Sequence, residues 1–165
     1  MKAIAVTLWI VCQLLTASAR ADLAIIEVTP GIYRGPAPET AADFRQLRCL
    51  GVKTVLDIRG FRQRQLKEEA RSVRAHGMCY LNIPVAFRPE RDQSPERALA
   101  ALANPRRHPI YIHCKLGEDR AGLIVALYRV RCQGWSRCAA HAEMMRLGFK
   151  PYFRAMERYF WDHAK

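Results

Sequence analysis

The sequence predicts a single α/β domain with a central, largely parallel sheet of four to five strands and helices on both faces. Short apolar runs alternate with longer segments whose apolar residues recur at helical spacing, and glycine or proline separates them. The chain has 165 residues, half of them hydrophobic, which suits one domain with a substantial core. Alternation of strands and helices indicates parallel strands joined by helical crossovers.

Strands and helices alternate strictly in the first half of the chain. The expected elements are a strand over residues 28–34, a helix over 39–49, a strand over 53–58, a helix over 65–76 and a strand over 78–83. Pro38 precedes the first helix and Gly51 stops it, while Gly77 ends the second helix. Pro84 ends the third strand.

The second half begins with a polar loop. Its expected elements are the loop 85–94, a helix from about 95 to 104, a strand over 110–113, and helices over 120–133, 136–147 and 151–163. Ser94 is the expected N-cap of the first of these helices, because Pro95 follows it and suits the first helical position. The strand at 110–113 leads through a tight loop into the next helix, at the sheet edge where such folds usually place their ligands.

Residues 1–21 differ from the rest and read as a signal peptide, followed by the domain over 22–165. Lys2 gives a short positive region, residues 3–15 form an apolar run that is short for a membrane span, and Ala19-Arg20-Ala21 fits the small-x-small cleavage pattern. A periplasmic or secreted domain beginning at Asp22 is expected. The alternative is an uncleaved segment that anchors the domain in the inner membrane, which also places it outside the cytoplasm.

The loop after strand 110–113 carries the chemistry. It holds a cysteine, five intervening residues and an arginine, so the chain can circle one tetrahedral oxyanion with Cys114 and Arg120 facing it. Loop amides and the start of the following helix supply positive potential, which favours the thiolate. Arg120 offers a planar fork for two phosphate oxygens. Gly117 stands where the backbone must come close to the ligand or adopt a positive φ.

The stretch His113-Cys114-Lys115-Leu116-Gly117-Glu118-Asp119-Arg120-Ala121-Gly122 resembles the His-Cys-x-x-Gly-x-x-Arg-Ser/Thr-Gly loop of the cysteine-dependent protein phosphatases. It is most similar to their compact dual-specificity and tyrosine phosphatase branch, and the flanks resemble secreted bacterial members. The similar flanking segments are residues 32–38, 51–59, 128–135 and 142–149. The resemblance covers about residues 28–150 and implies a protein tyrosine phosphatase-like fold.

The resemblance implies a two-step mechanism without metal or cofactor. Cys114 attacks phosphorus to form a cysteinyl-phosphate that water then hydrolyses, and His113 fixes the loop and helps to keep Cys114 ionised. Arg120 and the loop stabilise the transition-state charge. The expected phosphate-binding residues are Lys115, Leu116, Gly117, Glu118, Asp119 and Arg120.

The general acid is where the sequence departs from the resemblance. Relatives often carry an aspartate shortly after the Ile-Pro that ends the preceding strand, but this chain has Phe87 there. Asp92, further along the same loop, is the favoured acid. Asp119, directly before Arg120, is the rival, and Glu96 and Glu118 are weaker candidates. A positioned acid contributes roughly 10²–10⁴ in rate.

Ala121 is a second departure, since the family usually has Ser or Thr there to ease release of the cysteine sulfur. Together with Phe87 it keeps open a phosphate-binding pseudophosphatase that recognises phosphorylated partners without turnover. A rhodanese-like sulfurtransferase is a third hypothesis, disfavoured by the His-Cys start of the loop and the helical tail.

The chain is strongly basic, with a formal charge of +12, which attracts anionic substrates. Its basic residues are scattered and no nucleic-acid-binding motif is visible, so no nucleic acid partner is expected. Glu118 and Asp119 at the rim should repel crowded phosphates, which favours a phosphorylated protein (phosphotyrosine or phosphoserine) or a small phosphomonoester over inositol or lipid phosphates. Cys132 and Cys138 could pair, but ordinary helix positions are the favoured interpretation.

Overall fold

The computed structural model describes residues 22–60, 62–91 and 93–165. The expected signal peptide and Asp92 therefore lie outside the described residues. Among the described residues no helix is both long enough and apolar enough to span a bilayer.

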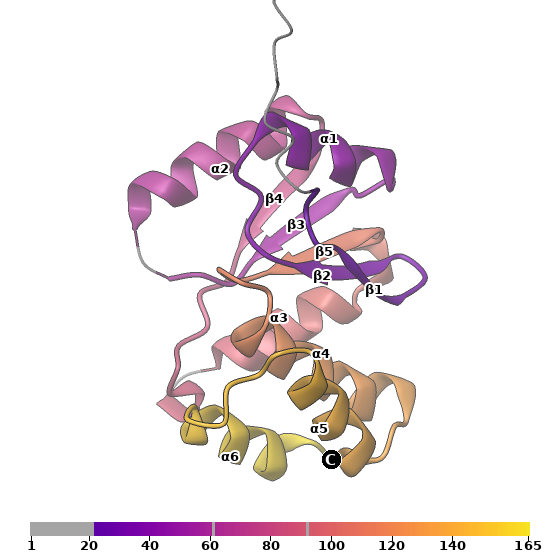
Figure 1. The fold of residues 1–165 in the computed structure, drawn as a ribbon, viewed down its shortest axis with the longest axis vertical. Helices are drawn as coiled ribbons and strands as arrows, with labels where there is room; N and C mark the ends of the chain where they lie inside the picture. The colour runs from indigo at the N-terminus through magenta and orange to yellow at the C-terminus, as the bar shows by residue number, and fades with distance from the viewer. Residues whose placement is uncertain (1–21, 61, 92) are drawn as a thin grey trace, which may run out of the picture.

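Five strands form one sheet in the order β1-β2-β5-β3-β4 (Figure 1). Their bounds are β1 Ile26–Thr29, β2 Ile32–Gly35, β3 Thr54–Asp57, β4 Cys79–Asn82 and β5 Ile110–His113. Strands β2, β5, β3 and β4 run parallel, and β1 pairs antiparallel with β2 at the edge. The predicted fold class, with its largely parallel sheet, is confirmed.

In the part of the chain that the structure describes, six α-helices cover the two faces of the sheet. They are α1 Ala41–Cys49, α2 Gln63–Ala75, α3 Ser94–Ala103, α4 Asp119–Gln133, α5 Arg137–Arg146 and α6 Arg154–His163, with short 3-10 turns at Pro89–Arg91 and Pro105–Arg107. Helices α1 and α2 lie on one side of the sheet and α3 to α6 on the other (Figure 1).

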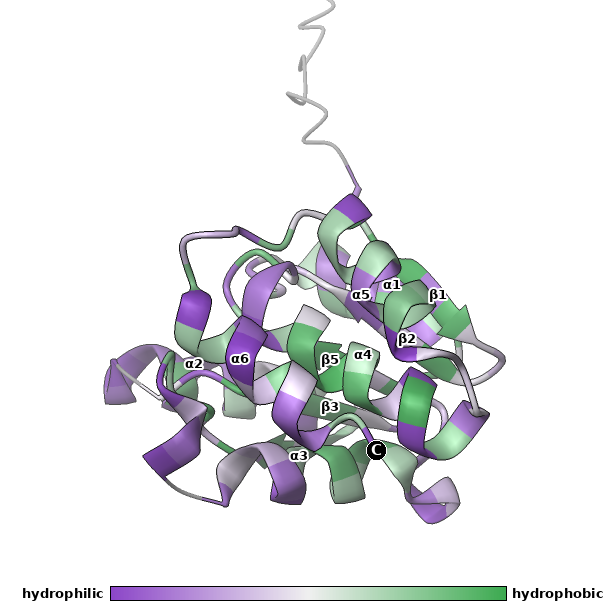
Figure 2. Cartoon of the chain, turned by 90° about the horizontal axis from the view of Figure 1, so that it is seen from below, coloured by the Kyte–Doolittle hydropathy of each residue, from purple (hydrophilic) through white to green (hydrophobic). Residues whose placement is uncertain are grey.

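Each face of the sheet has its own hydrophobic core. Phe44, Leu47 and Val73 pack with Val55 and Tyr111 beneath α1 and α2. The larger core lies between the sheet and α3 to α6, and its members include Leu56, Ile112, Leu102, Leu123, Ile124, Met144 and Phe160. Figure 2 shows the hydrophobic colour concentrated in β3, β5 and the adjoining part of α4, whereas α2 and α6 carry strongly hydrophilic segments. Helix α4 is buried on most of its surface because it lies at the centre of this second layer.

Two predicted features differ in the structure. The strand expected over residues 28–34 is instead a hairpin, because Pro30 and Gly31 form a turn between β1 and β2. Ser94 is not the N-cap of α3, since the helix begins at Ser94 itself and Gln93 takes the cap position. Other element bounds agree with prediction to within a few residues.

The register of the parallel strands brings four chain segments to one edge of the sheet. Gly35 pairs with His113, His113 with Asp57, and Asp57 with Asn82, each being the last residue of its strand. The segments that follow these residues therefore leave the sheet side by side. One of them is the Cys114–Arg120 loop.

Candidate active site

The loop between β5 and α4 curls tightly around a buried cysteine. Cys114 is only 3% exposed and directly follows the fully buried strand β5. Gly117 has φ +77°, and a Cβ there would lie 2.3 Å from the carbonyl of Gly35. Only glycine fits this position, because the conformation is left-handed and the backbone of β2 presses against it. Helix α4 then starts at Asp119, so its first amide groups belong to the loop.

Arg34 of β2 holds this loop from behind. Its guanidinium donates from Nε and Nη2 to the carbonyl of Gly117, at 3.1 and 2.6 Å, and from Nη2 to the carbonyl of Glu118 at 3.2 Å. The amide of Ala37 donates to the carbonyl of Lys115 at 3.0 Å. Carbonyls held on the outside of a loop leave its amides free to face the inside. Burial lowers the pKa of Arg34, while its electrostatic interaction with Cys114 acts to raise it.

Arg120 lies in the first turn of α4 and is 8% exposed. Its Nη1 is 3.5 Å from the carbonyl of Ile58, in the segment that follows β3. The centre of its guanidinium lies 4.7 Å from the ring of Phe87, which stacks on Phe153 at 4.7 Å between centroids. The guanidinium is thus fixed by a carbonyl on one side and an aromatic face on the other.

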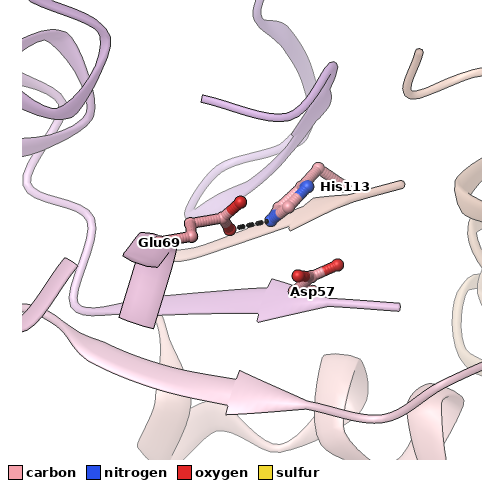
Figure 3. A group of neighbouring side chains, drawn as sticks. All are labelled: Asp57, Glu69 and His113. Atoms are coloured by element: carbon pink, nitrogen blue, oxygen red, sulfur yellow. Dashed lines mark ion pairs between the residues drawn. The ribbon is translucent and has the colours of Figure 1, made fainter. Parts of the chain in front are cut away.

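His113 anchors the loop to the sheet. Its Nδ1 lies 3.0 Å from the carbonyl oxygen of Cys114, and its Nε2 lies 2.8 Å from Oε1 of Glu69 on α2 (Figure 3). Arg59 bonds to both Asp57 oxygens, at 2.9 and 2.8 Å, and to Oε2 of Glu69. Tyr80 donates to Asp57 at 2.7 Å. The cluster ties β3, β4, β5 and α2 together beneath the loop.

Asp57, Glu69 and His113 offer ligand atoms within 4.8 Å of one another, a spacing that could suit a metal ion. Arg59, however, already bridges the two carboxylates, so an ion would have to displace its guanidinium. We therefore describe the group as a network of paired charges. Burial acts to raise the pKa of Asp57, but Arg59, His113 and Tyr80 outweigh it and hold that pKa below its ordinary value.

A cleft of about 290 Å³ opens beside the loop. The residues that line it are Ala37, Glu39, Arg59, Gly60, Arg62, Gln65, Lys115 and Arg120. Arg59 is neutralised by its carboxylate partners, which leaves Arg62, Lys115 and Arg120 facing one acidic residue, Glu39. Arg62 holds a left-handed conformation, with φ +73°. The cleft beside Cys114 is therefore cationic, which suits an anionic ligand.

Glu118 and Asp119 do not line the rim as two free carboxylates. Nζ of Lys150 donates to Oε2 of Glu118 at 2.7 Å, and the amide of Lys150 donates to Oδ1 of Asp119 at 2.9 Å. The hydrogen bond to Glu118 raises the pKa of Lys150. Both acidic side chains are thus held by the segment between α5 and α6. Lys150 offsets the charge of Glu118, whereas Asp119 keeps its charge, and the expected repulsion of crowded phosphates stays a prediction.

The other predicted site residues that the structure describes lie either in the loop or next to it. Lys115 and Leu116 are exposed at the mouth of the loop, and Ala121 is fully buried behind it. Phe87 is 40% exposed next to Arg120, at the position where relatives often carry their acid. Asp92 lies outside the described residues.

Three functional positions escape sequence reasoning. Arg34 belongs to segment 32–38, which resembles bacterial members of the family, but nothing local shows that it would reach the loop. Glu69 reads as one of two adjacent glutamates in a helix, and Lys150 as a residue between two helices. In each case the partner is remote in sequence, as the 83-residue separation of Arg34 and Gly117 illustrates.

The cysteines outside the loop form no disulfide among the described residues. Cys49, Cys79, Cys132 and Cys138 are free and exposed, and Cys114 is free and buried. Cys132 and Cys138 occupy helix positions in α4 and α5, which confirms the favoured interpretation.

Comparison with known proteins points in one direction. A family model described as "DSP-PTPase phosphatase fused to NAD+ Kinase" matches residues 9–155. The dual specificity protein phosphatase TpbA of Pseudomonas aeruginosa (strain UCBPP-PA14) is 32% identical over 127 residues, which are 76% of this chain and 55% of that protein. The chain thus spans about half the length of that curated relative. The inositol diphosphatase SIW14 of Saccharomyces cerevisiae is 36% identical over 64 residues, 39% of this chain and 22% of that protein.

Solved structures agree with this result. The crystal structure of P. aeruginosa TpbA superposes with a TM-score of 0.71 at 27% identity, over 85% of this chain and 84% of that chain. A cysteine-to-serine variant of TpbA in complex with phosphotyrosine gives 0.70 at 27% identity, over 84% and 83%. The core catalytic domain of SIW14 gives 0.72 at 22% identity, over 84% of each chain, and shows the shared fold.

The matched region takes in all five strands and the whole of the Cys114–Arg120 loop. The chain therefore belongs to the DSP-PTPase phosphatase family, within the cysteine-dependent dual-specificity phosphatases.

Proposed function

We propose that this chain is a metal-independent, cysteine-dependent phosphatase of phosphomonoesters. The observation that carries the proposal is the loop itself, in which Cys114 lies inside a ring of backbone whose carbonyls at Lys115, Gly117 and Glu118 are held outward. Such a ring with Arg120 at its end can hold the three non-bridging oxygens of a phosphate.

The reaction has two steps. The Cys114 thiolate forms a bond to phosphorus while the bond from phosphorus to the leaving oxygen breaks, and that oxygen takes up a proton. Water then attacks the cysteinyl-phosphate, breaks the sulfur–phosphorus bond and releases inorganic phosphate. Arg120 and the loop amides stabilise the charge on the oxygens in both transition states. Asp92 is the proposed proton donor, because Asp119 is bonded to the Lys150 amide.

The proposed substrate is a phosphotyrosyl side chain on a protein. Phe87 and Phe153 form a stacked aromatic wall whose inner ring lies against the Arg120 guanidinium, and Phe87 is 40% exposed. A substrate ring that entered beside the loop would meet the exposed part of the Phe87 ring. The phosphotyrosine bound in TpbA, a relative of this chain, supports the same substrate class.

Inositol or lipid phosphates are the second candidate. The cationic cleft with Arg62 and Lys115 favours a ligand that carries more than one anionic group, and Glu118 and Asp119 are both held by Lys150. The similarity to an inositol diphosphatase supports this candidate as well.

Hydrolysis of p-nitrophenyl phosphate with EDTA present tests the proposed activity. We expect turnover in the wild type that is lost in Cys114→Ser. Equal phosphate release by both proteins would exclude Cys114 as the nucleophile. Tight vanadate binding without turnover would favour the pseudophosphatase that Ala121 and Phe87 leave open. A panel of phosphotyrosyl peptides and inositol phosphates then ranks the two substrate classes by kcat/KM.

We also propose that residues 1–21 direct the domain out of the cytoplasm. Lys2, the apolar run 3–15 and Ala19-Arg20-Ala21 support this proposal. Mass spectrometry of the protein from a periplasmic extract tests it. A first residue of Asp22 is expected, whereas retention of the full chain in the membrane fraction would favour the anchor.

A further inference from the structure

We infer that Glu69 is a positioning residue that keeps His113 as a buried imidazolium directly beneath the catalytic loop. The inference rests on the proposed function, because it concerns the ionised state of Cys114. Glu69 lies on α2, which takes no other part in the catalytic loop, so neither the sequence nor the proposed mechanism assigns it a role.

The contacts of the two ring nitrogens carry the first step. Nδ1 lies 3.0 Å from the carbonyl oxygen of Cys114, and a carbonyl can only accept, so Nδ1 bears a proton. Nε2 lies 2.8 Å from Oε1 of Glu69, within ion-pair distance but not aligned as a hydrogen bond, and neither atom has a hydrogen-bond partner among the described residues. A nitrogen lone pair at that distance from a carboxylate oxygen would be repelled. A proton on Nε2 as well makes the ring a cation.

The balance of buried charge carries the second step. The cluster beneath the loop contains two carboxylates, Asp57 and Glu69, that are 0% and 7% exposed. Arg59 supplies one positive charge and bonds to both of them. A second cation is needed to neutralise the pair, and uncompensated buried charge is costly. His113, which is fully buried and in contact with Glu69, is the group placed to supply it.

Among the described residues, the carboxylates grouped with His113 are Asp57 and Glu69. Tyr111 stacks on its ring, and burial raises the pKa of that phenol, so Tyr111 stays neutral. Burial likewise raises the pKa of Tyr80, which donates to Asp57. On the loop side the charged groups are Cys114, Arg120 and Arg34, the last through the Gly117 carbonyl. Figure 3 shows the ring of His113 between Glu69 and the end of β5.

The order of the charges decides their effect on the cysteine. His113 contacts the Cys114 backbone, and Glu69 lies on the far side of the ring, so the cation is nearer to the thiolate than its counter-ion is. The pair therefore stabilises the thiolate even though it is neutral as a whole. Without the carboxylate, His113 loses the partner that keeps it charged, and Cys114 loses this support.

Glu69→Gln tests the inference, because it removes the charge and keeps the shape. Glu68→Gln is the matched control, since Glu68 is the preceding residue on the same helix and pairs with exposed Arg64. The measurement is the rate of Cys114 alkylation by iodoacetamide against pH, resolved by peptide mass spectrometry because the other described cysteines are exposed. We expect the midpoint to rise by about one pH unit in Glu69→Gln, a roughly tenfold slower reaction below it, and no change in Glu68→Gln. Superposed profiles for wild type and Glu69→Gln would overturn the inference.

Nitrogen-15 NMR of the wild-type ring provides a second measurement that does not depend on whether the variant folds. The His113 signals, assigned by their loss in His113→Gln, should show both nitrogens protonated at pH 7.5. A neutral tautomer would overturn the inference. Neither measurement needs turnover. If Glu69→Gln showed the expected shift in alkylation midpoint but the wild type released no phosphate, only the proposed phosphatase activity would be refuted.

Discussion

Arg34 and Gly117 stand 83 residues apart in sequence, yet the Arg34 guanidinium donates two hydrogen bonds to the Gly117 carbonyl, at 3.1 and 2.6 Å. Arg34 is 1% exposed, so these bonds form where water cannot replace them. They fix the outward direction of the loop carbonyl. The anion ring beside β5 thus depends on a side chain from β2.

Substitution of Arg34 should damage the ring without touching a reacting atom. In Arg34→Ala we expect a loss of about 10² in kcat/KM and a lower melting temperature, because the carbonyls of Gly117 and Glu118 lose their donors. Arg34→Lys should recover part of the stability but little of the activity, since an ammonium cannot reproduce the fork. Circular dichroism melts beside p-nitrophenyl phosphate kinetics make the comparison. Full activity in Arg34→Ala would contradict the clamp.

Gly117→Ala should abolish phosphate binding for two reasons. The backbone of Gly117 is left-handed, and a Cβ there would collide with Gly35. The Cβ would meet the Gly35 carbonyl at 2.3 Å, so the loop must move. We expect vanadate affinity and kcat/KM to fall by 10² or more, as a rough estimate for a lost oxyanion cradle. Gly134→Ala is the matched control, since it has φ +71° but nothing within 4 Å. That variant should lose about 1 kcal/mol of stability and keep its activity. Equal vanadate affinities for the two variants would show that strain alone, and not the loop contact, is at work.

Phe87→Asp should give the enzyme a second source of protons. Phe87 lies beside Arg120, at the position where relatives often carry the acid. On an alkyl phosphate, whose leaving oxygen needs a proton, we expect kcat to rise about tenfold, a fraction of what a fully positioned acid contributes. Phe87→Asn controls for loss of the ring. An increase in both variants would assign the effect to opening of the cleft rather than to proton transfer.

Substitution of two aspartates, one at a time, tests which of them is the general acid of the wild-type enzyme. Asp92→Asn should lower kcat on an alkyl phosphate by about 10² and leave p-nitrophenyl phosphate, a good leaving group, little changed. Asp119→Asn should have the smaller effect, because Oδ1 of Asp119 already accepts from the Lys150 amide. Steady-state kinetics on both substrates separate the roles. The opposite order of effects would move the acid to Asp119.

The parts of the site that sequence could predict are those held together by adjacent residues. The strand, loop and helix around Cys114 and Arg120 follow from local apolar pattern and spacing, and the structure has the strand as predicted and the helix to within one residue. The largely parallel sheet could be predicted because strands and helices alternate along the chain. The hairpin at β1 and β2 differs because apolar residues flank the Pro30–Gly31 turn and make one continuous strand pattern.

The parts that sequence could not predict depend on tertiary register. Arg34 reaches the loop because β2 and β5 end at the same edge of the sheet, and Glu69 reaches His113 at the end of β5 from helix α2. Lys150, from a segment remote in sequence, pairs its ammonium with Glu118 and donates its backbone amide to Asp119. Pairings of this kind leave no local signal in either partner.

Asp57 gives the chain a defined acid limit to its stability. Its pKa is held below the ordinary value of 3.8, so ionised Asp57 stabilises the folded state above about pH 4, and this contribution is lost as the pH falls through the folded-state pKa. Asp57→Asn removes one partner of a buried pair and should cost about 3 kcal/mol at pH 7. The gap between variant and wild type should narrow as the pH falls below 4. Urea unfolding at pH 7 and pH 3 measures it, with Glu68→Gln as an exposed control expected within about 0.5 kcal/mol of wild type at both values. A gap that stayed constant between the two pH values would mean that Asp57 acts through its shape and not through its charge.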